Sequence, residues 1–404
     1  MAADRTAVPT ISGPAQRRAS LPSLTGLRFL AAMCVFLYHT SYLADPLKPT
    51  MPVSFFRDHG VAQPIADFLE PAGRIGVSFF FVLSGFVLCW SATPGERATS
   101  FWRRRILKIY PNHIVTWALA MWLFASSTPV HAYLLNLFLL HGFSNRPDTA
   151  VSVNFPSWSL CCEMLFYALF PLFIVLVRRI SERRLWWWAA GMVAGVGAVT
   201  VVTTQLVSGG VSSPFGSLSA NQEWFGYEFP PPRLFEFVLG MILARIVAAG
   251  LWPRIGLIPS FALFAVGYWG AIKLPNPYDF SLVTIVPIGM IMCAAAAADM
   301  RGESGWLRSR TMVLLGNVSF AFYMLQALVI FYGRPKVLHA HTYATVPAIG
   351  MWILLFLANL LAAWLLYTLV EHPIMRRFAR SRKKPAAPVV PPRTAQSVPT
   401  GEAV

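Results

Sequence analysis

The stretch Leu24-Thr-Gly-Leu-Arg28-Phe-Leu-Ala-Ala-Met-Cys-Val-Phe-Leu-Tyr-His39 decides how this chain can fold. It is apolar over nearly its whole length, as a membrane-spanning helix is, yet it carries an arginine near its start and a histidine deep inside. Arg28 and His39 share one face of a helix and are separated by about 16 Å along its axis. Ionisable residues within membrane helices usually line a cavity or a path, so this pair is a candidate functional site.

The composition of the 404-residue chain is not that of a soluble protein. Hydrophobic residues make up 56% of it and charged residues only 12%, whereas soluble domains carry about 25% charged residues. Most of the Lys and Arg behind the net charge of +16 lie in short runs between apolar segments, as the positive-inside rule produces. We therefore expect a lipid bilayer as the surroundings and no nucleic acid as a partner, since no soluble domain could hold a basic groove.

Apolar windows of about 20 residues, the length that crosses a bilayer, predict an all-α integral membrane protein with a bundle of about ten transmembrane helices. An apolar piece at about 131–142 is too short to span and is predicted to be re-entrant or interfacial. Alternation from a cytoplasmic N-terminus places the basic runs and both chain ends in the cytoplasm of a bacterial cell, with Arg334 and Lys336 left outside. The predicted spans are 26–44, 74–92, 106–126, 157–177, 185–207, 233–250, 256–272, 280–299, 311–332 and 346–370.

Three regions are predicted along the chain. Residues 1–23 are polar and contain no apolar core, so they indicate a disordered cytoplasmic segment and not a cleavable signal peptide. Residues 24–375 form the transmembrane domain. Residues 376–404 are rich in Lys, Pro, Ala and Thr and are predicted to be a disordered basic cytoplasmic tail. The five cysteines lie in or beside apolar segments without a Cys-x-x-Cys pair, and we interpret them as buried core residues, with no metal site.

His39 has two interpretations. A histidine inside a membrane helix can form a hydrogen bond to a neighbouring helix and stabilise the bundle modestly. Alternatively it is a general base, since imidazole is the side chain best poised to take a proton near neutral pH. Taken alone, the residue favours neither.

A basic run, Arg103-Arg104-Arg105-Ile-Leu-Lys108, stands at the start of the third predicted span. Such a run can serve only to orient the chain, and for Arg103 that role suffices. Arg105 and Lys108 are three residues apart and point the same way on a helix. A cationic ledge of this kind is what a phosphate-bearing cofactor needs, so Arg104, Arg105 and Lys108 are candidate binding residues together with Arg28.

The stretch Trp158-Ser-Leu-Cys-Cys-Glu163-Met-Leu-Phe-Tyr167 carries a second polar stripe. Ser159, Glu163 and Tyr167 recur every four residues and so line one face of a helix. A glutamate inside an apolar span needs a partner, most obviously a basic residue. The pair can be a purely structural lock or an element of a site.

Two weaker motifs complete the set. Ser84-Gly85 places two small residues in the middle of a predicted helix, where they allow close approach of another backbone. Arg233 and Glu236 stand three residues apart at the start of a span, either as an internal ion pair or as a site element.

In this order the motifs resemble those of the acyltransferase 3 family, the membrane O-acyltransferases that modify sugars, cell-envelope polymers and some secondary metabolites. The family's opening Arg-x10-His element matches Arg28 and His39. Its Trp-Ser-Leu-x-x-Glu-x-x-Phe-Tyr element matches Trp158 to Tyr167 at every named position. The resemblance covers roughly residues 21 to 380. Further matches are Ser84-Gly85-Phe86, Arg103 to Pro111, Arg233 to Gly240 and Leu315 to Phe320.

The chain departs from the family pattern at three places. Phe29 follows Arg28 where the family often has glycine. Lys108 replaces the last arginine of the basic run, which keeps the charge but loses the bidentate geometry. Gln326 stands where many members have a histidine, so no catalytic role is assigned there.

The resemblance implies acyl-CoA, commonly acetyl-CoA, as a co-substrate from the cytoplasm, and no permanently bound cofactor. His39 would deprotonate or orient the acceptor hydroxyl, Arg28 and the basic run would hold the phosphates, and Glu163 would either support the imidazole or pair with a basic residue. The acceptor would be a sugar, a glycan or a macrolide, and the compact chain is similar to enzymes that acylate macrolides. Site-shaping roles would fall to Ser84, Trp158, Ser159, Tyr167, Arg233 and Glu236.

Two other classes of protein remain open at this stage. A secondary transporter of similar span count would move its substrate without consuming CoA and would usually show repeat symmetry. A non-catalytic membrane scaffold would leave an arginine and a histidine on one helix face unexplained.

Overall fold

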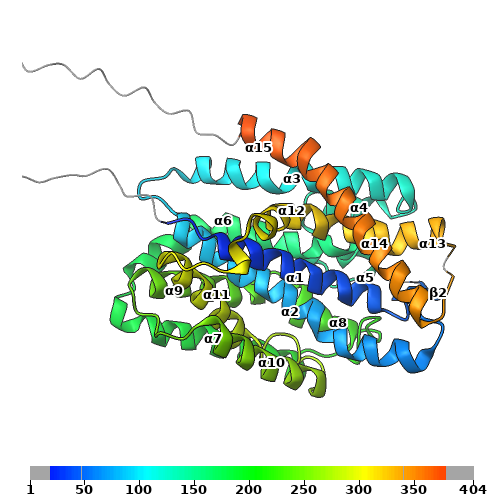
Figure 1. Cartoon of the computed structure of the whole chain (residues 1–404), viewed down its shortest axis with the longest axis horizontal. Coiled ribbons are helices and arrows are strands. Elements are labelled where there is room, and N and C mark those ends of the chain that lie inside the picture. The colour runs from blue at the N-terminus through cyan, green and yellow to red at the C-terminus, as the bar shows by residue number, and fades with distance from the viewer. Residues whose placement is uncertain (1–18, 47, 340, 379–404) are drawn as a thin grey trace, which may run out of the picture.

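The computed structural model describes residues 19–46, 48–339 and 341–378, which form a bundle of helices with one small hairpin (Figure 1). The hairpin consists of β1 (Ala44–Asp45) and β2 (Lys48–Pro52), paired antiparallel. The α-helices are α1 (Pro22–Ser41), α2 (His59–Ser91), α3 (Ala98–Leu123), α4 (Val130–Leu137), α5 (Pro147–Ala150), α6 (Trp158–Arg179), α7 (Leu185–Gln205), α8 (Ala220–Glu223), α9 (Leu234–Ala248), α10 (Leu257–Lys273), α11 (Ile285–Met300), α12 (Arg310–Ala327), α13 (Arg334–Val337), α14 (Thr345–Leu366) and α15 (His372–Phe378).

Each of the ten predicted spans overlaps one of these helices, so the all-α prediction is confirmed for the described residues. Within that part of the chain, five helical stretches are long and apolar enough to cross a membrane; α10 and α11 are apolar but shorter. The count of ten spans and the cytoplasmic location of both termini stay predictions. The five stretches are His59–Ser91, Phe155–Arg179, Glu182–Gln205, Arg310–Val337 and Thr345–Phe378.

The short apolar piece at 131–142 does not form a continuous helix. α4 ends at Leu137 after 8 residues, which is about 12 Å of helix and far less than a bilayer requires. Much of the predicted terminal disorder, at 1–23 and 376–404, lies outside the described residues. α1 begins inside the first of these segments, at Pro22, and α15 extends into the second, to Phe378.

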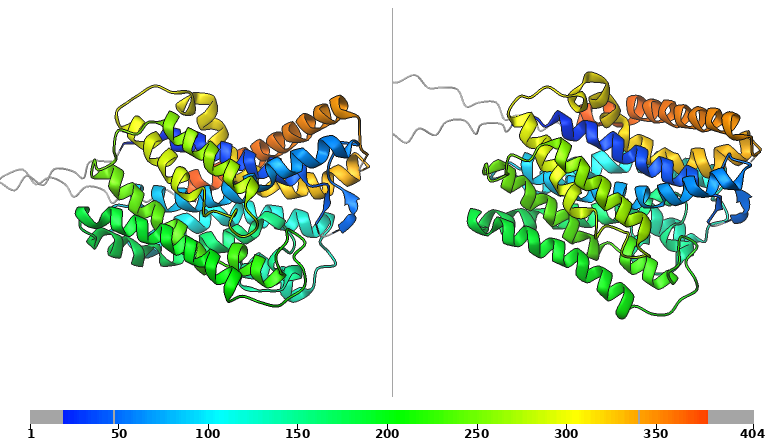
Figure 2. Two further views of the ribbon diagram at one scale, coloured as in Figure 1. Left: turned by 90° about the horizontal axis from the view of Figure 1, so that it is seen from below. Right: turned by 60° about the horizontal axis from the view of Figure 1, so that its bottom comes forward.

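α1 is central to the bundle and packs against α2 on one side and α12 on the other (Figures 1 and 2). α2 in turn packs closely against α9 because both helices have a glycine at the contact. A Cβ on Gly85 would overlap the carbonyl oxygen of Phe237, and a Cβ on Gly240 would overlap the carbonyl oxygen of Val82. The close backbone approach predicted for the Ser84-Gly85 element is therefore confirmed.

The two ends of the bundle differ in charge. The loops at 93–97, 180–184, 249–256 and 301–309 lie at the end where α1 begins, and each contains arginine; we call this the basic end (Figure 1). The β1–β2 hairpin lies at the opposite end, which we call the hairpin end. Arg334 lies there too, fully buried, with its guanidinium donating to the carbonyl oxygens of Ser54 at 2.6 Å and His341 at 3.3 Å.

Three π-helical segments interrupt or extend the regular helices. They are Trp224–Glu228 between α8 and α9, Leu328–Gly333 after α12 and Tyr367–Glu371 after α14. Such segments are rare and occur frequently at functional sites, because the wider turn redirects side chains. The first supplies Tyr227 and Glu228 to a cavity described below, the second supplies Phe331 to another, and the third supplies Glu371, which pairs with Lys108.

Candidate active site

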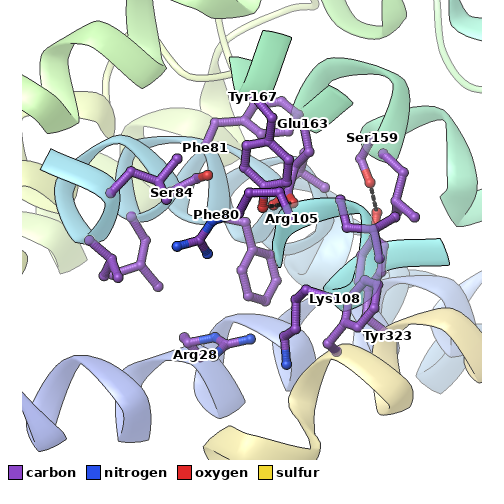
Figure 3. A pocket seen from close by; sticks show the side chains of 17 residues that line it. Arg28, Phe80, Phe81, Ser84, Arg105, Lys108, Ser159, Glu163, Tyr167 and Tyr323 are labelled. Atoms are coloured by element: carbon purple, nitrogen blue, oxygen red, sulfur yellow. Dashed lines mark hydrogen bonds between the residues drawn. The ribbon is translucent and has the colours of Figure 1, made fainter. Parts of the chain in front are cut away.

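A cavity of about 900 Å³, part of it open to the surroundings, lies among α1, α2, α3, α6 and α12 (Figure 3). Four ionisable side chains line it: Arg28 from α1, Arg105 and Lys108 from α3, and Glu163 from α6. We call it the cationic cavity. Residues from three sequence motifs, far apart along the chain, therefore face one space.

Arg28 and Arg105 have no carboxylate within ion-pair distance in the described part of the chain. The Arg105 guanidinium lies over the ring of Phe101 at 5.4 Å, and its Nε is buried without a hydrogen-bond partner. Lys108, in contrast, forms an ion pair with Glu371, the last residue of the third π-helical segment. Two unpaired guanidinium groups are thus available to an anionic ligand.

Glu163 belongs to the cationic cavity and does not reach His39, which lines a different space. Its Oε2 accepts a hydrogen bond from the Tyr167 hydroxyl at 2.6 Å. Glu163 shares the cavity with basic side chains but forms no ion pair with them among the described residues, so its role stays a prediction. Arg104 lies outside the cavity and forms an ion pair with Glu96.

A second cavity, of about 400 Å³, adjoins the first. Val77 and Tyr323 line both. His39 faces this second space, which we call the histidine cavity, and only 4% of its surface is exposed. Its ring contacts those of Phe155 and Phe331, with centroids 5.2 and 6.0 Å apart.

One ring nitrogen of the His39 imidazole has no hydrogen-bond partner in the described chain. Its Nδ1 is buried without a partner, although the amide of Gln326 lies beside it. Both amide atoms of Gln326 are themselves without partners. The choice between a structural and a catalytic role for His39 stays open, and Gln326, on the neighbouring helix α12, is a neighbour that sequence reasoning left without a role.

Tyr323 stands where the two cavities meet. Its hydroxyl lies 2.8 Å from the Ser159 hydroxyl and donates to the carbonyl oxygen of Pro156 at 3.1 Å. Ser159 faces the cationic cavity and the preceding residue, Trp158, faces the histidine cavity. The start of α6 therefore forms part of the wall between them.

Arg233 and Glu236 line neither of these cavities. They form a buried ion pair at 3.2 Å, and the guanidinium also donates to the carbonyl oxygens of Gly226 at 2.5 Å and Tyr227 at 2.9 Å. The pair thus holds the first π-helical segment, which supplies Tyr227 and Glu228 to the histidine cavity. The Arg233–Glu236 pair therefore contacts the histidine cavity only indirectly, through this segment.

A family model described as an acyltransferase domain matches residues 21–368. The chain belongs to the acyltransferase 3 family. Acyltransferase MdmB of Streptomyces mycarofaciens is 38% identical to this acyltransferase over 380 residues, which cover 91% of the chain and 95% of that protein.

More distant relatives bear names that specify an acetyl group. Peptidoglycan O-acetyltransferase OatA of Listeria monocytogenes is 23% identical over 89% of this acyltransferase and 56% of its own length. The putative peptidoglycan O-acetyltransferase YrhL of Bacillus subtilis is 25% identical over 59% of the chain and 34% of its own length. No solved structure matches this acyltransferase. The predicted enzyme class is confirmed, and the transporter and scaffold alternatives are no longer needed.

The predicted site residues of this acyltransferase fall into three groups. The roles assigned to them stay predictions, but their positions are clear. In the cationic cavity are Arg28, Ser84, Arg105, Lys108, Ser159, Glu163 and Tyr167; in the histidine cavity are His39 and Trp158; and in neither are Arg104, Arg233 and Glu236.

Proposed function

We propose that this acyltransferase is a membrane O-acyltransferase that moves an acyl group, acetyl or another short chain, from acyl-CoA to a hydroxyl of a sugar, a glycan or a macrolide-type metabolite. The observation that carries the proposal is the pair of adjoining cavities, with Arg28 and Arg105 unpaired in one and His39, whose Nδ1 has no partner, in the other. The names of OatA and YrhL, both O-acetyltransferases, support a hydroxyl acceptor.

The cationic cavity suits the phosphates of the donor. Guanidinium groups form short, bidentate hydrogen bonds with phosphate oxygens. Arg28 stands in the second turn of α1, towards the basic end of the bundle, and His39 lies about 16 Å further along the same helix. A donor held by its phosphates at Arg28 and Arg105 would extend its thioester towards Val77 and Tyr323, where the cavities meet.

His39 would act on the acceptor from the other side of that junction. Its imidazole takes the proton of the acceptor hydroxyl while the oxygen forms a bond to the thioester carbonyl carbon. The carbon–sulfur bond then breaks, and the CoA thiolate leaves with the proton returned by the imidazolium. The Tyr323 and Ser159 hydroxyls lie at the junction and both donate to the Pro156 carbonyl oxygen; one of them would have to turn from that oxygen to stabilise the negative charge that develops on the thioester carbonyl oxygen.

Two neighbouring arginines allow a matched test. In purified protein, acyl transfer is followed by release of the CoA thiol with a hydroxyl acceptor present. We expect Arg105→Ala to raise KM for acyl-CoA about 10- to 100-fold, since a charged hydrogen bond contributes about 1.5–3 kcal/mol. Arg104→Ala, which removes a side chain already paired with Glu96, should change KM less than about threefold. Equal effects of the two variants would contradict the donor site, and no acceptor-dependent thiol release would overturn the proposed function.

A further inference from the structure

The histidine cavity contains two carboxyl groups for which the acyl transfer step above has no use. Glu223 and Glu228 both line it, with 4% and 6% of their surfaces exposed. Among the described residues that line this cavity there is no lysine or arginine. The Glu228 carboxyl makes no ion pair or hydrogen bond within the same part of the chain.

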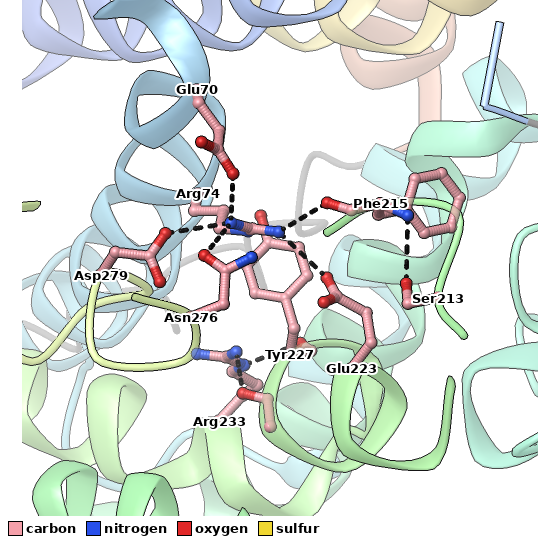
Figure 4. A network of polar contacts seen from close by, with 10 residues as sticks. Glu70, Arg74, Ser213, Phe215, Glu223, Tyr227, Arg233, Asn276 and Asp279 are labelled. Atoms are coloured by element: carbon pink, nitrogen blue, oxygen red, sulfur yellow. Dashed lines mark hydrogen bonds and ion pairs between the residues drawn. The ribbon is translucent and has the colours of Figure 1, made fainter. Parts of the chain in front are cut away.

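Glu223 does have a cationic neighbour, but that neighbour is already shared (Figure 4). The guanidinium of Arg74, on α2, contacts Glu223 Oε1 at 3.3 Å, Asp279 Oδ2 at 3.0 Å and Glu70 Oε1 at 3.4 Å. One positive charge therefore faces three carboxylates. Glu223 Oε2 is left buried without a hydrogen-bond partner, on a side chain that faces the cavity.

Arg233, which lies close to this network, does not supply the missing charge because it is paired with Glu236. A buried carboxylate without a counter-ion is costly, so a cavity with this charge balance favours a cation.

Aromatic rings form much of the wall of the histidine cavity. Trp158 and Tyr227 pack on each other with their ring centroids 4.7 Å apart, and the Tyr227 ring already faces the guanidinium groups of Arg74 and Arg233. Aromatic faces attract ammonium groups through the ring quadrupole, and carboxylates combined with such rings are a recurrent arrangement for amines. The aromatic residues that line the cavity are Tyr38, Phe155, Trp158, Phe215, Tyr227 and Tyr323.

We propose that the histidine cavity binds a protonated or quaternary amine, so that the acceptor of this acyltransferase is a hydroxyl compound that bears a basic nitrogen. The assignment of that amine to the acceptor rests on the proposed function, whereas the amine site itself does not. An ammonium group held by Glu223 and Glu228 would place a hydroxyl of the same molecule beside His39. The carboxylates would thus select the acceptor and orient it.

The histidine cavity is narrow as it stands. Only about 20 Å³ of it is open to the centre of a water molecule, so its side chains would have to move apart to admit an amine group. Beyond Phe155, a larger hollow of about 1620 Å³ lies between the end of α3 and the residues around Phe331 and Lys336. Phe155 lines both spaces, so the remainder of a larger acceptor can occupy the hollow at the hairpin end.

Tetramethylammonium is a direct probe of the amine site, because it is permanently charged and needs no catalysis. Purified protein is titrated with its chloride, with sodium chloride as the ionic-strength control, and binding is followed by the thermal midpoint and by tryptophan fluorescence. We expect saturable binding that Glu223→Gln and Glu228→Gln each weaken about tenfold or more. Asp279→Asn is the matched control: it also removes a carboxylate from Arg74 but does not line the cavity, so binding should change less than about threefold.

An activity measurement separates failure of this inference from failure of the proposed function. Acyl transfer is compared between methyl glucosaminide and its N-acetylated, uncharged counterpart, and the amine should have the higher kcat/KM in wild type but not in Glu228→Gln. Tetramethylammonium binding that depends on Glu228, without any acyl transfer, would refute the proposed function and leave the amine site standing. Acyl transfer without such binding would overturn the inference. An equal loss of activity for both acceptors in Glu228→Gln would also overturn it, since the carboxylates would then act on the His39 imidazolium and not on the amine of the acceptor.

Discussion

The two cavities adjoin, yet the acidic and basic groups that line them are opposite in kind. The cationic cavity presents Arg28 and Arg105 without carboxylate partners, and the histidine cavity presents Glu223 and Glu228 without a lysine or arginine in its described lining. A polyanionic donor would be attracted to the first cavity, whereas a cationic ligand would favour the ionised form of the two carboxyl groups in the second. On the proposed function, each reactant is selected by the groups of its own cavity, and only the uncharged reacting groups meet between them.

The cavities also differ in how the backbone builds them. Side chains at regular helical spacing supply much of the cationic cavity, such as Arg105 and Lys108 on α3 and Ser159 and Glu163 on α6. Short irregular segments supply much of the histidine cavity, including the π-helical segment Trp224–Glu228. On the proposed function, regular helices would hold a donor that many related enzymes could share, whereas the irregular segments can vary without disturbing the bundle.

Removal of the His39 imidazole should lower turnover more than any of the other substitutions, without weakening the binding of acyl-CoA. We expect His39→Ala to lower kcat about 10²- to 10⁴-fold, the usual contribution of a general base. Affinity for acyl-CoA should change less than about threefold, because the phosphates bind in the other cavity. Turnover and equilibrium binding of acyl-CoA, measured on the same preparation, check both statements.

A parallel loss of acyl-CoA binding in His39→Ala would show that the two cavities are one site. Wild-type turnover in that variant would remove His39 from the mechanism altogether. His113→Ala is the control, since that histidine is buried elsewhere and bonded to the carbonyl oxygen of Asn136 at 3.0 Å.

A larger side chain at the junction should keep the two reactants apart without preventing either of them from binding. Val77 lines both, and Val77→Phe would add a ring between the thioester and the acceptor. We expect kcat to fall about 10²-fold, because a displacement of about 1 Å between reacting groups has an effect of that size. Binding of acyl-CoA and of tetramethylammonium should each persist within about threefold.

The matched variant for this test is Val87→Phe, at a residue that lines only the cationic cavity and is 37% exposed. Its kcat should stay within about threefold of wild type. If Val77→Phe turned over normally while its thermal midpoint was unchanged, the reactants would have to meet somewhere other than this junction.

The same contrast explains which site residues could be predicted from the sequence. Arg105, Lys108, Ser159 and Glu163 were predicted because helical periodicity places them on shared faces, and α3 and α6 keep that period in the structure. Glu223 carried no such signal, since it comes from a helix of 4 residues in a long loop. Its environment depends on a contact with Arg74, 149 residues away in the sequence.

Arg104 shows that a sequence pattern can also include a residue that lies outside the cavity. It stands beside Arg105 in the basic run, and the run alone does not reveal which of the two faces the cavity. The ion pair with Glu96, eight residues earlier in the loop before α3, turns Arg104 away. Gln326 is a third case: its place beside His39 follows from the packing of α12 against α1, which the sequence pattern does not specify.

A smaller effect is expected from the hydroxyl at the junction. Tyr323→Phe keeps the ring in both cavities but removes the hydrogen bonds to Ser159 and to the Pro156 carbonyl oxygen. A loss of about 0.5–1.5 kcal/mol would lower kcat about 3- to 10-fold, with the affinities of both ligands unchanged. Tyr268→Phe is the control, since that hydroxyl donates to the Phe68 carbonyl oxygen outside both cavities. A change in KM for acyl-CoA, without a change in kcat, would assign Tyr323 to donor binding instead.

The smallest predicted effect uses pH to change the charge of the histidine cavity alone. Glu228 lies outside the predicted spans, and burial, reinforced by the nearby Glu223, raises the pKa of its carboxyl to about 8. The group is therefore mostly neutral at pH 7 and mostly ionised at pH 9. Because tetramethylammonium does not titrate, its affinity should rise about threefold or more over this interval.

Glu228→Gln should abolish that rise, while acyl-CoA binding to the cationic cavity should not follow the same curve in either protein. An identical pH dependence in wild type and Glu228→Gln would assign the titration to another group, with Glu223 the first to examine because it faces the same space and shares Arg74 with two other carboxylates. A flat profile in wild type would mean that Glu228 is already ionised at neutral pH. The histidine cavity would then be negatively charged even without a ligand. The difference in charge between the two cavities would be larger than the raised pKa of Glu228 implies.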